Sequence, residues 1–110
     1  MALSTHVLDI ARGVPGIGID VALFSLGDDG VSEIARETTD ADGRIVAPFG
    51  GPLAPGLYEL RFYVDEYFEE LELISMYDEI PVRFTIHDES RHYHIPLLLA
   101  PWGYSTYRGG

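Results

Sequence analysis

The 110-residue chain is acidic, with 18 Asp and Glu residues against 7 Arg and no Lys, which gives a formal net charge of −11. This charge argues against nucleic acid and anionic membrane surfaces as partners, because both are themselves negative. The chain has no cysteine, which excludes disulfides, cysteine-based zinc sites and thiol catalysis.

The length predicts a single domain over residues 1–110, and a hydrophobic content of 46% is typical of a folded globular protein. No apolar run approaches the roughly 20 residues that a membrane-spanning helix needs. The first nine residues lack the basic and apolar regions of a secretion signal. We therefore expect a soluble, cytoplasmic protein.

Short strands separated by turn signals follow one another along the chain, a pattern typical of a β-sandwich. Residues 40–43 read Asp-Ala-Asp-Gly and predict a tight turn, because Gly43 adopts a positive φ at little cost. Residues 57–64 and 82–86 alternate apolar and polar side chains, as half-buried strands do. Eight strands are predicted in chain order, at 5–10, 20–26, 32–38, 44–49, 57–64, 82–86, 92–99 and 104–108.

Residues 65–75 interrupt the strand pattern and predict a short amphipathic helix. Phe68, Leu71 and Ile74 recur every three residues, which places them on one helical face. Asp65 is the expected N-cap residue. The acidic residues between these positions are interpreted as a solvated face.

Histidines supply the candidate reactive groups on the outer faces of two strands. If Tyr93 and Ile95 pack into the core, His92 and His94 point outward, and His6 does so if Val7 packs inward. His92 and His94 could begin a metal site, but a metal ion needs at least a third ligand and the spacing nominates none. We therefore predict no metal, and the residues alone leave a sandwich with surface histidines.

Four separated segments resemble the signature regions of the transthyretin-like 5-hydroxyisourate hydrolases. They are Leu-Ser-Thr-His-Val-Leu-Asp at 3–9, Thr-Asp-Ala-Asp-Gly-Arg at 39–44, His-Tyr-His-Ile-Pro-Leu-Leu-Leu at 92–99 and Tyr-Ser-Thr-Tyr-Arg-Gly-Gly at 104–110. The resemblance covers essentially the whole chain, in the order and spacing of that family. It implies an all-β, transthyretin-like sandwich of two four-stranded sheets with one short helix. It also implies a homotetramer without a cofactor, with active sites in a channel where two dimers meet.

The resemblance implies two sets of site residues and one reaction. The implied catalytic residues are His6, Arg44 and His94, and the implied substrate-binding residues are Tyr107, Arg108, Gly109 and Gly110. The family usually ends in Ser where this chain has Gly110. The implied reaction is hydrolysis of 5-hydroxyisourate to 2-oxo-4-hydroxy-4-carboxy-5-ureidoimidazoline, a step of urate degradation.

These residue types suit the hydrolysis of a cyclic amide. Histidine titrates near about pH 6.5, so it can accept a proton from water at neutral pH. An arginine guanidinium offers a rigid fork of donors for a planar substrate and a developing oxyanion. The sequence does not choose between the two histidines as base, nor between Arg44 and Arg108 at the oxyanion.

Two other functions are weighed against this enzyme. One is a transthyretin-type carrier that binds small aromatic ligands in the same channel, and the other is a non-catalytic sandwich that mediates subunit contacts. The pair His6 and His94, together with residues 107–110, favours the enzyme, because the hormone carrier lacks these features.

Overall fold

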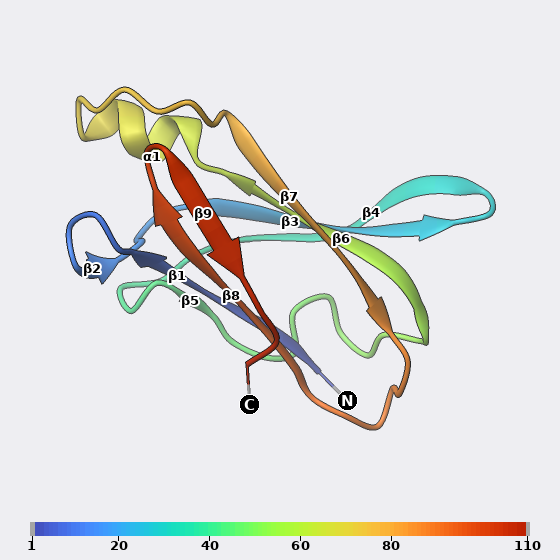
Figure 1. The fold of residues 1–110 in the computed structure, drawn as a ribbon. Coiled ribbons are helices and arrows are strands. Elements are labelled where there is room, and N and C mark those ends of the chain that lie inside the picture. Colours follow the sequence, from blue (N-terminus) through green and yellow to red (C-terminus); the bar gives the residue numbers. More distant parts are fainter. Residues whose placement is uncertain (1, 110) are drawn as a thin grey trace.

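The computed structural model describes residues 2–109, and within them two β-sheets pack face to face with one short helix at one end (Figure 1). The all-β sandwich expected from the sequence is confirmed. The elements in chain order are β1 (Leu3–Asp9), β2 (Val14–Pro15), β3 (Asp20–Gly27), β4 (Gly30–Thr38), β5 (Arg44–Ile45), β6 (Gly56–Tyr63), α1 (Asp65–Glu70), β7 (Glu79–Ile86), β8 (Tyr93–Ala100) and β9 (Gly103–Thr106).

The sheet that carries the candidate histidines has the order β2-β1-β8-β9, and β5 also pairs with β1. β1 and β8 run parallel, whereas β8 and β9 form an antiparallel hairpin. β5 pairs with Thr5 and His6, and β2 pairs with Leu8 and Asp9, so the two short strands follow each other along one edge of β1. This sheet therefore has five strands where four were expected, because β2 and β5 share the same edge of β1. The other sheet has four, in the order β4-β3-β6-β7.

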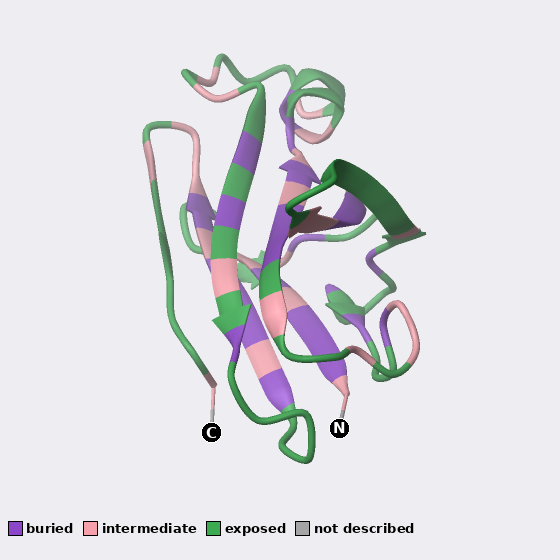
Figure 2. Cartoon of the chain, turned by 90° about the vertical axis from the view of Figure 1, so that its right-hand side faces the viewer, coloured by how far each residue is buried: buried purple, intermediate pink, exposed green. Residues whose placement is uncertain are grey.

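The core lies between the two sheets, and buried residues alternate with exposed ones most clearly along β7 (Figure 2). Val7 on β1 and Leu97 on β8 are fully buried, and so are Leu23 and Leu60 of the opposite sheet. Burying one such side chain contributes about 1.5–3 kcal/mol before the entropy of ordering it is subtracted. Because alternate residues point to opposite faces, burial of Val7 and Ile95 turns His6 and His94 outward, as predicted.

The predicted strand 44–49 is wrong after its first two residues. β5 ends at Ile45, and Pro48 has no N–H with which to continue a ladder. Phe49 is nevertheless fully buried, and its N–H donates to the carbonyl oxygen of Leu3 at 2.9 Å. The regular pairing with β1 therefore ends at Ile45, one residue after Arg44.

The helix is shorter than predicted. α1 ends at Glu70, and Glu72 adopts a φ of 58°, which stops further helical turns. Phe68 is buried as expected, but Ile74 is 81% exposed, so the predicted apolar face does not extend past the first turns. The N-cap is Val64, without a side-chain bond, so the assignment of Asp65 as N-cap was wrong. No helix within residues 2–109 is long and apolar enough to cross a membrane.

Candidate active site

Three neighbouring strands bring His6, Arg44 and His94 onto one outer face. β1 lies between β5 and β8, with His6 directly opposite Arg44 and Ser4 directly opposite His94. His6 and Ser4 are two residues apart, so all four side chains lie on the same side of the sheet. The ring centroids of His6 and His94 are 6.4 Å apart, with the planes tilted by 37°.

The turn at residues 40–43 presents Arg44 to His6. One carboxylate oxygen of Asp40 accepts the backbone N–H groups of Asp42 and Arg44, each at 2.9 Å, and these bonds lower the pKa of Asp40. Gly43 has a φ of 75°, and a Cβ at this position would lie 2.5 Å from the carbonyl oxygen of Val7. Glycine is therefore required here, because the turn packs directly on the backbone of β1.

The hydrogen bonds of His6 define its tautomer. His6 Nε2 lies 3.0 Å from the carbonyl oxygen of Asp42, and a carbonyl can only accept. Nε2 therefore carries a proton and donates, which leaves Nδ1 with a free lone pair in the neutral ring. Burial, and then the positive charge of Arg44, lower the pKa of His6. The neutral, basic form is thereby favoured near neutral pH.

His94 belongs to a cluster that also contains Ser4 and His92. Ser4 Oγ lies 2.7 Å from His94 Nδ1 and 3.0 Å from His92 Nε2, and the two rings stack at 6.5 Å with an angle of 15°. Burial is the largest cause that lowers the pKa of His94, followed by Arg44, His6 and His92. Because Nδ1 faces Ser4, Nε2 is the nitrogen of His94 that is left for a ligand.

Ser4 and His92 were not among the predicted site residues. Strand alternation does place His92 on the face of His94, but nothing local indicates Ser4. The contact depends on the pairing of β1 with β8 in this register, and the two residues joined are 90 positions apart.

Two hollows lie on this face, and Arg44 lines both. The larger, of about 610 Å³, is also lined by His6, Leu8 and Asp42. The smaller, of about 230 Å³, is also lined by Ser4, His92 and His94. Within residues 2–109 the Arg44 guanidinium forms no salt bridge, although Asp42 lines the larger hollow with it and the positive charge of Arg44 helps to lower the pKa of Asp40.

The C-terminal segment contributes Gly109 to this face. The Gly109 N–H donates to the carbonyl oxygen of His94 at 2.6 Å, and the glycine lies directly against the imidazole. A Cβ on Gly109 would lie 2.6 Å from His94 Cδ2, so this position requires a residue without a side chain. Gly110 lies outside the described residues.

Arg108 points away from His6, Arg44 and His94. Its guanidinium lies 4.6 Å from the centroid of the Tyr93 ring, and its Nη2 is 3.4 Å from the carbonyl oxygen of His92. Because Gly109 pairs with His94, strand alternation sends Arg108 to the opposite side of the sheet. Tyr107 is 57% exposed, and with Arg108 it lines a separate hollow of about 230 Å³.

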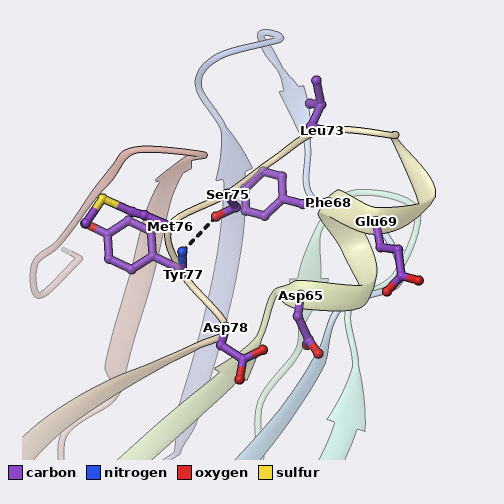
Figure 3. Close-up of a pocket in the computed structure, with 8 residues that line it drawn as sticks. All are labelled: Asp65, Phe68, Glu69, Leu73, Ser75, Met76, Tyr77 and Asp78. Carbon is purple, nitrogen blue, oxygen red and sulfur yellow. Dashed lines mark hydrogen bonds between the residues drawn. The ribbon is translucent and has the colours of Figure 1, made fainter.

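A further hollow of about 300 Å³ lies beside α1 and contains none of the predicted site residues (Figure 3). Phe68 and Tyr77 form part of its wall, together with the carboxylates of Asp65, Glu69 and Asp78. Among residues 2–109, no three His, Asp or Glu side chains are grouped closely enough to hold a metal ion together. The face around His6, Arg44 and His94 is therefore the candidate active site.

Comparison with known proteins shows the family of the chain. Residues 3–109 match the HIUase/Transthyretin family. The chain belongs to this family. It is 44% identical over 112 residues to the 5-hydroxyisourate hydrolase of Deinococcus radiodurans. This match covers 97% of this chain and 94% of the relative. The sequence-based prediction of a transthyretin-like hydrolase family is thus confirmed.

Solved structures similar to this chain include a 5-hydroxyisourate hydrolase and a transthyretin in complex with thyroxine. The 5-hydroxyisourate hydrolase of Klebsiella pneumoniae has a TM-score of 0.86 and 37% identity, covering 98% of this chain and 92% of its own. Sea bream transthyretin, solved in complex with thyroxine, has a TM-score of 0.91 and 27% identity, covering 99% and 95%. The fold is therefore shared by the hydrolase and by transthyretin, and the higher sequence identity is to the hydrolases.

Proposed function

We propose that this protein hydrolyses 5-hydroxyisourate to 2-oxo-4-hydroxy-4-carboxy-5-ureidoimidazoline in urate degradation. The observation that carries the proposal is the grouping of His6, Arg44 and His94 on one exposed face of three adjacent strands. The relatives named as 5-hydroxyisourate hydrolases support the choice of substrate.

The two histidines are suited to activating one water molecule. Neutral His6 offers Nδ1 and His94 offers Nε2, because the other nitrogen of each ring is engaged by Asp42 or Ser4. Rings 6.4 Å apart leave space for a water molecule between them. The pKa values of both rings are lowered, which favours the neutral, basic form of each histidine near neutral pH.

Arg44 is suited to binding the substrate and stabilising the developing charge. When water attacks the ring carbonyl, a C–O bond forms, one water proton passes to imidazole and the carbonyl oxygen gains negative charge. The guanidinium can donate to this oxyanion in a fixed planar geometry. Collapse of the adduct then breaks the C–N bond, and the imidazolium returns the proton to the departing ring nitrogen.

We further propose that the protein acts as a homotetramer with sites where two dimers meet. The face around the site exposes apolar groups, since Leu8 and Leu98 are only half-buried in the single chain. Arg108 points away from His94 of its own chain, so we assign its substrate contact to the site of a neighbouring copy. Tyr107, also exposed, is assigned to the same contact.

The test is to follow the ultraviolet absorbance of freshly generated 5-hydroxyisourate with and without protein. Decay well above the spontaneous rate supports the hydrolase, and decay at the spontaneous rate rejects it. The second candidate is a carrier, favoured by the TM-score of 0.91 to thyroxine-bound transthyretin. Titration with thyroxine in the same preparation distinguishes the two, because a carrier binds it without accelerating the decay of 5-hydroxyisourate.

A further inference from the structure

Ser4 joins the candidate base to a second histidine that is open to solvent. Its Oγ is 2.7 Å from His94 Nδ1 and 3.0 Å from His92 Nε2. Ser4 is only 8% exposed, whereas His92 is exposed. The three groups therefore form a continuous hydrogen-bonded path from the site to solvent.

The hydrogen-bonding capacity of Ser4 restricts the tautomer of His94. A serine hydroxyl has one proton and two lone pairs. If Ser4 donates to His94 Nδ1, the neutral ring carries its proton on Nε2, and that nitrogen cannot accept a proton from water. If Ser4 accepts from His94 Nδ1–H and donates to His92 Nε2, His94 Nε2 keeps its lone pair. Only the second arrangement makes His94 a base.

We infer that Ser4 and His92 are positioning residues that hold His94 in the Nδ1–H form and relay its proton during hydrolysis. This inference rests on the proposed function. As a water proton reaches His94 Nε2, the Nδ1 proton passes to Ser4 Oγ, and the hydroxyl proton of Ser4 passes to His92 Nε2. The reverse transfers restore the His94 imidazolium, whose Nε2–H then protonates the departing ring nitrogen of the substrate.

The charges around His94 favour moving its positive charge outward. Arg44 on β5 and His6 on β1 face the same ring, and the C-terminal segment places Arg108 against the backbone of His92 rather than against either ring. No carboxylate is among the groups of residues 2–109 that perturb His94. A cation on His94 is therefore beside Arg44 with no counter-charge, whereas a cation on exposed His92 is solvated.

Steady-state kinetics with four variants test the relay. Ser4→Ala should lower kcat by at least about tenfold with KM within about twofold, because it removes the hydroxyl bonded to the base and leaves Arg44 and the His94 ring in place. Ser4→Thr keeps the hydroxyl and should recover most of kcat. His92→Gln keeps a partner for Ser4 but cannot take a proton, so it should also lose kcat. His87→Gln, at an exposed histidine outside the site, is the matched control and should equal the wild type.

Nitrogen NMR of the substrate-free protein reports the tautomer of His94, which a purely structural role of Ser4 would leave unchanged. Imidazole ¹⁵N shifts report which nitrogen carries the proton, and we expect Nδ1–H for His94 at neutral pH in the wild type and a shift towards Nε2–H in Ser4→Ala. Nε2–H in the wild type, or an unchanged kcat in Ser4→Ala, would overturn the inference, and wild-type kcat in His92→Gln would overturn the relay. A wild type without 5-hydroxyisourate turnover would reject the proposed function, while the NMR result would still decide whether Ser4 sets the tautomer.

Discussion

Gly109→Ala tests whether the position of the His94 ring controls the reaction. A methyl group on Gly109 would lie 2.6 Å from His94 Cδ2, 3.2 Å from Cγ and 3.3 Å from Cβ. Carbon atoms pack favourably from about 3.5 Å, so the ring edge or the terminal segment must move by roughly 1 Å. Cδ2 is bonded to Nε2, the proposed base. Because misplacing a reacting group by about 1 Å can cost about 10²-fold, we expect kcat to fall by roughly ten- to hundredfold.

The matched control for this variant is Gly103→Ala in the same terminal hairpin. A Cβ on Gly103 meets nothing within 4 Å, so this protein should keep the wild-type kcat. Initial rates of 5-hydroxyisourate loss, corrected for spontaneous decay, give kcat and KM for both variants, and circular dichroism melting shows whether each is folded. Wild-type kcat in Gly109→Ala would refute the reasoning, whichever of the two groups had moved.

Four further predictions concern the histidines and the absence of a metal. His6→Ala and His94→Ala should each lower kcat by at least about tenfold, while His87→Ala should be nearly silent; equal losses in all three would contradict the site assignment. Because burial and Arg44 lower the pKa of His6 and His94, kcat/KM should rise through an acidic limb centred below the ordinary histidine value of about 6.5. The unfolded chain binds more protons than the folded one below that value, so stability should be full above about pH 6.5 and decline as the pH falls through the folded pKa values; a melting temperature that rises on acidification would contradict this. Dialysis against a strong chelator should leave turnover intact, and a loss that zinc restores would show that a metal is required.

Strand alternation made the outer histidines predictable. The apolar side chains of Val7 and Ile95 had to enter the core, so His6 and His94 had to leave it, and both are placed as expected. The turn before Arg44 was predictable for a similar reason, since Gly43 marks a positive φ. These inferences are local, and each needs only the period of a strand or the conformational freedom of one residue.

The hydrogen-bonded cluster was not predictable, because it depends on pairing between distant segments. Ser4 meets His94 through a parallel register of β1 and β8, and a sequence does not state which strands pair or in what register. The orientation of Arg108 was not predictable either. Both Tyr107 and Arg108 were expected to contact the substrate, but they lie beyond the end of β9, and only the bridge from Gly109 to His94 shows that Arg108 turns away from His94.

The orientation of Arg108 makes the contribution of a second copy testable by complementation. If His94 of one chain and Arg108 of another share a site, His94→Ala and Arg108→Ala proteins are each inactive alone but complement one another. An assembly with both chains contains sites that take intact His94 from the Arg108→Ala chain and intact Arg108 from the His94→Ala chain. Random mixing at equal concentration makes half of the chain pairs mixed, and one of the two sites in each mixed pair is complete. The mixture should therefore restore on the order of a quarter of the wild-type sites.

The mixture should be prepared by joint refolding, with mass spectrometry of differently tagged chains to verify that mixed assemblies form. A mixture of His94→Ala with His6→Ala is the control, because both residues line one chain's own face and no intact site can arise. Verified mixed assemblies without recovered turnover would show that Arg108 does not act across the interface. Its place over the Tyr93 ring would then be its whole role, since the cation lies 4.6 Å from that ring and stabilises the end of β8 instead.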